Sequence, residues 1–186
     1  EVGKSFISTN LAAILAQSQK RVLLIDADLR RGYIHKYFNQ NHQPGLAEYL
    51  NKQATLNEVI KATDILGLDL LTRGKSPVNP SELLSTPLFG EMLTQLSSQY
   101  DHILIDTSPI LAVTDGIIIS QHAGVNLLIA RYAQTQMKEL ELTVNRFEQA
   151  GVKVNGVILN DIQRSSAGYG YGYNYAYSYK ASKNED

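Results

Sequence analysis

Four apolar runs stand out along the chain, at residues 21–26, 102–107, 125–131 and 154–160. Each run holds consecutive rather than alternating apolar residues, which is typical of a strand buried on both faces of a sheet. The first run ends in Asp26, the second contains Asp106, and the fourth ends in Asn160. The pattern therefore predicts four strands, three of which have a polar residue near the carboxyl end.

Helical periods lie between these runs. Apolar residues recur at helical spacing in two places, at Ile7, Leu11, Ile14 and Leu15 and at Met137, Leu140, Val144 and Phe147. Thr86 followed by Pro87 is typical of an N-cap and a first helical position, and we expect this helix to reach about Ser98. The remaining elements are shorter, with helices expected at 45–51 and 55–62 and a strand at 68–73.

The alternation of strands and helices indicates an α/β fold in which helices cover both faces of a parallel sheet. After residue 163 the aliphatic residues stop, and the chain becomes rich in Gly, Ser, Asn and Tyr. We therefore expect a folded domain over residues 1–163 and a disordered, flexible tail over residues 164–186.

Composition excludes several classes of function. The net charge is −1, so no strong bulk field attracts nucleic acid, and we expect no nucleic-acid partner. The chain has no cysteine, which excludes disulfides and cysteine-bound metals. No apolar run approaches the roughly 20 residues of a membrane-spanning helix. The first residue is Glu1 rather than methionine, which predicts that the chain is a piece of a longer protein.

A glycine-lysine-serine motif, Gly3-Lys4-Ser5, comes directly before the first helical period. This order matches the second half of a phosphate-binding loop, in which the amides of a helix N-terminus bind phosphate oxygens. In such a loop Lys4 reaches the β- and γ-phosphates, and the Ser5 hydroxyl binds Mg²⁺. A match of only three residues is common in unrelated sequences. The motif alone is therefore as compatible with a chance occurrence as with a phosphate-binding loop.

Three aspartates lie where predicted strands end. Asp26 and Asp28 follow the first strand, and Asp106 follows the second. Ligands bind at the carboxyl ends of the strands in an open parallel sheet, and a carboxylate there can hold Mg²⁺ directly or through water. Each aspartate could instead cap its strand end, but three of them together with Gly-Lys-Ser favour a site for a nucleotide and Mg²⁺.

Six of the eleven tyrosines occupy every second position near the end of the chain, at Tyr169, Tyr171, Tyr173, Tyr175, Tyr177 and Tyr179. A period of two would place them all on one face of an edge strand. The glycine, asparagine and serine residues between them disfavour a strand. A flexible, glycine-spaced segment suits a substrate, so we expect the hydroxyls of this tyrosine cluster to accept phosphate.

The chain resembles the bacterial tyrosine autokinases of capsule and exopolysaccharide export, the Wzc-like family, through five stretches and the tyrosine cluster that follows them. The stretches are, in this order, GKS, LLIDADLRRGYIHKYF, NPSELLSTP, ILIDTSPILAVTD and GVILND. The resemblance covers essentially the whole chain and implies a parallel-sheet P-loop NTPase fold of the MinD/ParA-like superfamily. It also implies an ATP- and Mg²⁺-dependent tyrosine kinase that phosphorylates its own tyrosine cluster, in trans between subunits.

The resemblance implies a role for each candidate residue. Lys4 would neutralise charge on the γ-phosphate, and Asp26 would accept the proton of the attacking tyrosine. Asp26 is a weak base for this task unless burial raises its pKa. Asp28 would support either Mg²⁺ or Asp26. The implied nucleotide-binding residues are Gly3, Lys4, Ser5, Phe6 and Asn160, and the implied Mg²⁺ ligands are Ser5, Asp28 and Asp106.

Two parts of this interpretation have open alternatives. Asn160 reads the adenine edge in related proteins, but a simple turn residue after a strand is equally open. Arg30 and Arg31 could contact phosphate or a neighbouring subunit, or could form a solvated basic pair.

The resemblance further implies partners and a location. The partners are other copies of the chain in a ring, a membrane polysaccharide co-polymerase segment fused upstream or acting as a separate activator, and a tyrosine phosphatase. The location is the cytoplasmic side of a bacterial inner membrane. Two other functions are open, namely a MinD/ParA-type ATPase and a nucleotide-gated, non-catalytic scaffold of an export complex. The tyrosine cluster argues against the ATPase, because hydrolysis by water requires no phenol.

Overall fold

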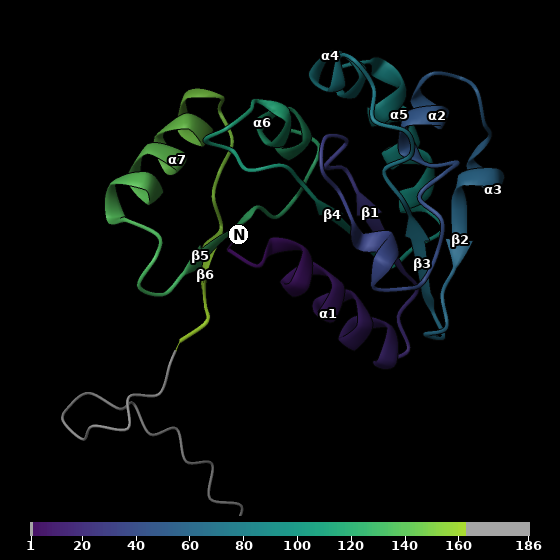
Figure 1. Ribbon diagram of the computed structural model, residues 1–186, viewed down its shortest axis with the longest axis horizontal. Helices are drawn as coiled ribbons and strands as arrows, with labels where there is room; N and C mark the ends of the chain where they lie inside the picture. Colours follow the sequence, from purple (N-terminus) through teal and green to yellow (C-terminus); the bar gives the residue numbers. More distant parts are fainter. Residues whose placement is uncertain (1, 163–186) are drawn as a thin grey trace, which may run out of the picture.

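The computed structural model describes residues 2–162, in which helices and strands alternate along the chain (Figure 1). The helices are α1 (Lys4–Gln17), the 3₁₀ helix η1 (Ile34–Lys36), α2 (Leu46–Leu50), α3 (Leu56–Val59), α4 (Pro80–Leu84), α5 (Pro87–Ser97), α6 (Asp115–Ser120) and α7 (Met137–Gln149). The strands are β1 (Val22–Asp26), β2 (Ile60–Ala62), β3 (Leu68–Leu71), β4 (His102–Asp106), β5 (Leu127–Arg131) and β6 (Gly156–Asn160). The tail predicted at residues 164–186, with its tyrosine cluster, lies outside the described residues.

The strands form two sheets, one with the order β2-β3-β1-β4 and one made of β5 and β6. Strand β1 pairs in parallel with β3 and with β4, and β5 pairs in parallel with β6. In the register of β1 and β4, Asp26 lies directly opposite Asp106. The predicted α/β fold is confirmed, and its topology makes these two strand-end aspartates neighbours.

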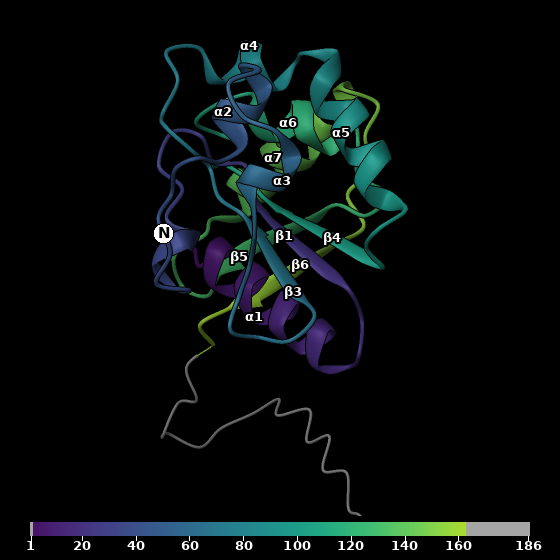
Figure 2. The same ribbon diagram turned by 90° about the vertical axis from the view of Figure 1, so that its right-hand side faces the viewer.

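Strand β1 runs through the centre of the core, and all of its residues are buried. Leu23 and Ile25 belong to the apolar cluster formed with α2 and α5 on one face of the sheet. Val22 and Leu24 belong to the cluster formed with α1 on the other face. Figures 1 and 2 show α1 on the opposite side of β1 from α2 and α5. The two helical layers therefore fix the strand and the aspartate at its carboxyl end.

Helix α1 forms where the apolar period predicts a helix, but its buried residues are alanines. Ala12 and Ala16 are buried against the sheet, whereas Leu11 and Ile14 are 37% and 62% exposed. Short alanine side chains allow the helix to lie close to the sheet and still pack without voids. The apolar period thus predicts the helix correctly, and of its four residues Leu15 packs against the cluster that contains these alanines.

The sequence predicts one helix over residues 55–62, and the second half of this prediction is wrong. Helix α3 ends at Val59, and β2 follows at once and pairs antiparallel with β3. The two strands are joined only by residues 63–67, with Gly67 at a φ of 85°. A parallel pair needs a crossover of about a dozen residues or more. The short connection therefore forces the antiparallel pairing, which is an exception to the predicted parallel sheet.

The last two strands are buried less completely than the sequence predicts. Residues of β6 alternate between half-buried and exposed, and Leu127 of β5 is 46% exposed. Residues 2–162 add no third strand to this small sheet. Its side chains are therefore covered less fully than those of the central strand β1.

The caps of the longer helices agree with the sequence. Helix α5 has Thr86 as its N-cap, Pro87 as its first residue and Ser98 as its C-cap, as predicted. Helix α7 also forms at the predicted place and buries Phe147.

Helix α6 is not predicted by the sequence analysis, and it begins at the fully buried Asp115. None of the described helices has the length and apolar character that crossing a lipid bilayer requires.

Candidate functional site

The Gly-Lys-Ser motif forms the turn at which α1 begins. Gly3 is the N-cap of α1, with a φ of 91° that glycine adopts at little cost. The first hydrogen bond of the helix runs from the Ile7 N–H to the Gly3 carbonyl, at 3.0 Å. The N–H groups of Lys4, Ser5 and Phe6 therefore have no acceptor within the helix. A helix N-terminus with free amides of this kind binds anions such as phosphate.

Asn160 lies against this turn from the end of β6. Its side-chain amide donates a hydrogen bond to the Val2 carbonyl at 3.0 Å. A Cβ added to Gly3 would lie only 2.3 Å from the Asn160 amide nitrogen, so the contact requires a glycine. Asn160 thus holds the backbone at the start of the phosphate loop, and its predicted contact with adenine stays a prediction.

Asp106 connects β4 to the first turns of α1. Its Oδ2 accepts a hydrogen bond from the Ser5 hydroxyl at 2.6 Å, and its Oδ1 accepts one from the Ser8 hydroxyl at 3.2 Å. Burial raises the pKa of Asp106, although the Ser5 hydrogen bond and the charge of Lys4 act in the opposite direction. The two predicted Mg²⁺ ligands Ser5 and Asp106 are therefore in direct contact.

Asp26 is fully buried at the end of β1. Its burial, and next the charge of Asp106, raise the pKa of Asp26 to about 7. This shift persists although its Oδ2 accepts a hydrogen bond from the Ile34 N–H at 3.1 Å. A carboxylate with a pKa close to neutrality is matched to proton transfer at physiological pH. The sequence analysis expects Asp26 to be a useful base only if burial raises its pKa, and the structure shows this burial.

Replacing Gly32 by alanine is expected to disturb this carboxylate. A Cβ at position 32 would lie 2.1 Å from Asp26 Oδ1, so the loop or the carboxylate must move. We expect the free energy of unfolding to fall by about 1–3 kcal/mol. Thermal unfolding measures this effect.

Gly124→Ala is the matched control, because nothing lies within 4 Å of a Cβ added there. Equal stability of Gly32→Ala and Gly124→Ala would show that the loop relaxes without disturbing Asp26.

Asp28 organises the loop that follows β1. Its Oδ1 accepts hydrogen bonds from the backbone N–H groups of Arg30 at 3.2 Å and Arg31 at 3.0 Å. The Ser108 hydroxyl donates to the same oxygen at 2.8 Å. The Asp28 carbonyl accepts the Gly32 N–H at 2.7 Å. Asp28 therefore caps its own turn and is tied to the segment that follows β4.

Arg30 extends from this loop to α6. Its Nε donates to Asp115 Oδ2 at 2.8 Å, and its Nη2 donates to Asp115 Oδ1 at 3.3 Å and to the Ser81 hydroxyl at 3.2 Å. The Ser81 hydroxyl also donates to Asp115. Asp115 is fully buried, whereas the Arg30 side chain is 38% exposed, so Arg30 is a solvent-accessible cation that pairs with a buried carboxylate. Arg31 is exposed, as expected for a solvated basic residue.

These residues fit a nucleotide with Mg²⁺. Mg²⁺ at nucleotide sites takes few ligands from the protein and the remainder from phosphate oxygens and water. The Ser5 and Asp106 oxygens, 2.6 Å apart, are of the type that can serve as such ligands, and they lie beside the N-terminus of α1. Within residues 2–162 no three His, Asp or Glu side chains form a group that could hold a metal by themselves. An ion completed by phosphate oxygens needs no such group.

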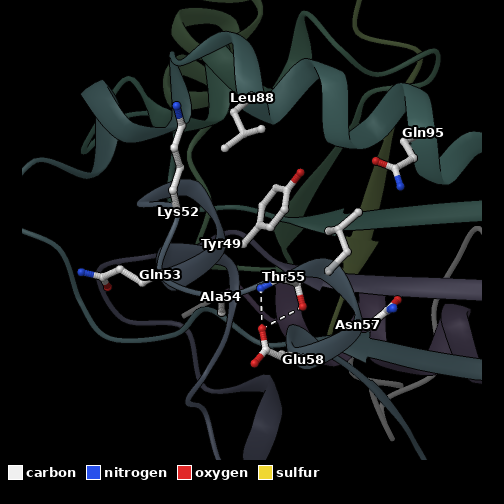
Figure 3. Close-up of a pocket in the computed structure, with 10 residues that line it drawn as sticks. Tyr49, Lys52, Gln53, Ala54, Thr55, Asn57, Glu58, Leu88 and Gln95 are labelled. Carbon is white, nitrogen blue, oxygen red and sulfur yellow. Dashed lines mark hydrogen bonds between the residues drawn. The ribbon is translucent and has the colours of Figure 1, made fainter.

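Two grooves lie outside this site. One, of about 420 Å³, is lined by Phe6 together with Tyr37 and Phe38. The backbone N–H of Phe6 is one of the free amides at the start of α1, and its contact with the nucleotide stays a prediction. The other, of about 670 Å³, lies between the α2–α3 connection and α5, where Figure 3 shows Tyr49 and Leu88 facing it. It contains none of the predicted site residues.

The structure places all predicted site residues of the described chain at the start of α1 or at the ends of β1, β4 and β6. The phosphate acceptors predicted in the tyrosine cluster lie outside the described residues. The sequence analysis does not single out Gly32, Ser108 or Asp115 as site residues. They lie in the stretches LLIDADLRRGYIHKYF and ILIDTSPILAVTD, so the same two stretches that suggest the site also contain its supports.

Comparison with known proteins shows a matching family and a similar curated protein. Residues 1–156 match a family described as an AAA domain. The tyrosine-protein kinase ptk of Acinetobacter johnsonii is 73% identical over 169 residues, which are 91% of this chain and 23% of that protein. The chain therefore spans less than a quarter of the length of this curated relative.

Solved structures show the same fold. The kinase domain of the Escherichia coli tyrosine kinase ETK superposes with a TM-score of 0.86 at 45% identity, over 93% of this chain and 68% of that chain. The septum site-determining protein MinD from Pyrococcus horikoshii, in complex with Mg-ADP, superposes with a TM-score of 0.70 at 20% identity, over 86% of this chain and 65% of that chain. At this lower identity the likeness concerns the fold alone.

Proposed function

The chain belongs to the family of bacterial tyrosine-protein kinase domains with an AAA-type fold, and from this premise we propose that it transfers the γ-phosphate of ATP to its own tyrosine cluster. The acceptors are the hydroxyls of Tyr169, Tyr171, Tyr173, Tyr175, Tyr177 and Tyr179. Transfer takes place between copies of the chain, so that the cluster of one copy enters the site of another.

In this reaction the hydroxyl oxygen of a tyrosine forms a bond to the γ-phosphorus of ATP. The bond between that phosphorus and the β–γ bridging oxygen breaks, and ADP leaves with the bridging oxygen. The tyrosine proton passes to the carboxylate of Asp26. The products are phosphotyrosine, ADP and a protonated Asp26, which then releases its proton to water.

The other residues of the site bind and orient the phosphates. The N–H groups at the start of α1 and the Lys4 ammonium stabilise negative charge on the β- and γ-phosphates. Ser5 and Asp106 would hold Mg²⁺, and Asp28 would support the ion or orient Asp26. The bound ion would supply positive charge against the negative charge that develops during transfer.

One observation carries the proposal, namely the position and environment of Asp26. It is fully buried and has a pKa raised to about 7, and it lies in register with Asp106, whose carboxylate contacts the phosphate-loop serine. A base and a metal ligand on adjacent strand ends can act on opposite sides of one γ-phosphate. A tyrosine kinase needs both a group that accepts the tyrosine proton and groups that hold Mg²⁺.

The proposal includes a cellular setting taken from the resemblance. The copies form a ring on the cytoplasmic side of a bacterial inner membrane and regulate the polymerisation and export of capsular polysaccharide or exopolysaccharide. A membrane co-polymerase segment, in the same chain or in a separate activator, accompanies the ring. A tyrosine phosphatase returns the cluster to its unmodified state.

Intact-mass spectrometry of the full-length protein with Mg²⁺-ATP tests this function. We expect successive additions of about 80 Da, the mass of one phosphate group. These additions should disappear when all six tyrosines of the cluster are replaced by phenylalanine. Tyr132→Phe is the control, because this exposed tyrosine lies outside the cluster. ATP turnover without added mass would instead support a MinD/ParA-type ATPase.

A further inference from the structure

An ion pair between the partly exposed Arg30 and the buried Asp115 connects the loop after β1 to the start of α6, 85 positions further along the chain. The Asp115 carboxylate is fully buried, and among residues 2–162 Arg30 is the only cation that forms an ion pair with it. Burial alone would raise the pKa of Asp115, but hydrogen bonds from Arg30 and Ser81 outweigh burial and lower it. Asp115 is therefore ionised at neutral pH, and it holds the guanidinium of Arg30 in one place.

The fixed position of Arg30 also restrains the Asp28 carboxylate. Its side chain is fixed by Asp115, while its backbone N–H donates to Asp28 Oδ1 at 3.2 Å. The Arg31 N–H and the Ser108 hydroxyl donate to the same oxygen. The other oxygen, Oδ2, accepts no hydrogen bond from residues 2–162, so it can bind Mg²⁺ or a water molecule of its hydration shell.

We propose that Asp115 is a positioning residue that, through Arg30, fixes the turn presenting the Asp28 carboxylate to Mg²⁺. The inference rests on the proposed function, because it assigns a task to a residue that touches neither the nucleotide nor the ion. Groups of this kind orient metal ligands in many proteins, and their loss weakens metal binding rather than the fold alone. Ser81 completes the arrangement by donating to the same buried carboxylate.

The test measures binding of a fluorescent ADP analogue to the full-length protein, with Mg²⁺ and with a chelator. The ratio of the two dissociation constants reports how much Mg²⁺ strengthens nucleotide binding. In Asp115→Asn we expect this ratio to fall by about tenfold, while binding without Mg²⁺ stays within about twofold of the wild type. Arg30→Lys keeps the charge but loses the bidentate contact with Asp115, and it should also lower the ratio.

Asp101→Asn is the matched control, because it removes an ion pair of 3.1 Å with Arg21 that is exposed and lies at the opposite end of the sheet. It should leave the ratio unchanged. A lower unfolding temperature of Asp115→Asn and Arg30→Lys with an unchanged ratio would overturn the inference in favour of a purely structural pair. If Asp115→Asn does not fold, Arg30→Lys decides the question alone.

Failure of the inference can be told apart from failure of the proposed function. Tyrosine phosphorylation of the wild-type protein is measured in parallel, and its absence would reject the kinase itself. A wild type that phosphorylates tyrosine, combined with variants whose Mg²⁺ ratio is unchanged, would reject only the positioning role of Asp115.

Discussion

Replacing Asp26 by asparagine is expected to slow phosphate transfer to tyrosine by about 10²–10⁴-fold, because the amide cannot accept the tyrosine proton. The side chain keeps its size, so the packing at the end of β1 is retained. Wild-type activity should rise with pH through about 7, the pKa to which burial raises Asp26. The residual activity of the variant should lack this dependence. Phosphotyrosine formation measured from pH 5.5 to pH 8 checks both statements.

The same substitution should stabilise the fold. The pKa of Asp26 is raised from its ordinary value of 3.8 to about 7 in the folded protein, so between these values the folded state binds more protons than the unfolded state. The free energy of unfolding therefore falls as pH rises through this window. Asp26→Asn removes the effect, and without nucleotide its unfolding temperature should exceed that of the wild type by at least about 3 °C at pH 8.

The two measurements separate catalysis from folding. The gain in unfolding temperature should be smaller at pH 5.5, where Asp26 is mostly protonated in the folded wild type. Asp64→Asn, in the turn that precedes β3, is a control outside the site. A gain in unfolding temperature of Asp26→Asn over the wild type that is no larger at pH 8 than at pH 5.5 would contradict a buried, ionising carboxylate. Near wild-type transfer by that protein would remove Asp26 as the base.

Replacing Lys4 by methionine is expected to reduce phosphate transfer by about 10²–10³-fold or more, since a fixed positive charge that faces the developing charge on the γ-phosphate is lost. Lys4 is only partly buried in the first turn of α1, so the fold should keep its unfolding temperature. Intact-mass spectrometry with Mg²⁺-ATP should then show no phosphate added to the tyrosine cluster. Binding of a fluorescent ATP analogue should weaken in the same variant.

Lys20→Met is the matched control, because Lys20 is exposed and lies beyond the opposite end of α1. It should phosphorylate the tyrosine cluster at the wild-type rate. Equal activity of the two lysine variants would mean that the Gly-Lys-Ser motif does not bind the transferred phosphate.

The parts of the fold that depend on local sequence can be predicted well. Strand β1 is a run of apolar residues, and α5 carries its own N-cap and first-turn proline, Thr86 and Pro87. The parts that fail depend on tertiary contacts. Residues 60–62 carry a helical pattern, but pairing with β3 across a short turn overrides it. The buried face of α1 is chosen by the fit of Ala12 and Ala16 to the sheet rather than by apolar content.

The residues of the site also differ in whether they can be predicted from local sequence or depend on tertiary contacts. Asp26 and Asp106 can be predicted to lie at the same edge of the sheet, because the carboxyl ends of parallel strands meet there. The pairing of β1 with β4 makes them direct neighbours. Gly3, Lys4 and Ser5 follow from a motif with a known physical purpose. The contact of Arg30 with Asp115 cannot be predicted in this way, since it depends on the direction of a long side chain and on a helix that the sequence pattern does not reveal. The need for glycine at position 32 likewise depends on a contact across the loop.

The ion pair of Arg30 with the buried carboxylate of Asp115 also bears on how such a domain can adapt to heat. Replacing a buried ion pair by apolar side chains of similar volume often stabilises a protein by about 1–4 kcal/mol. Under selection for thermostability, apolar substitutions at these two positions would therefore raise the stability of the fold. Because the same pair sets the turn around Asp28, that gain would come with slower phosphate transfer. These positions are where thermostability and reaction rate compete during the evolution of the domain.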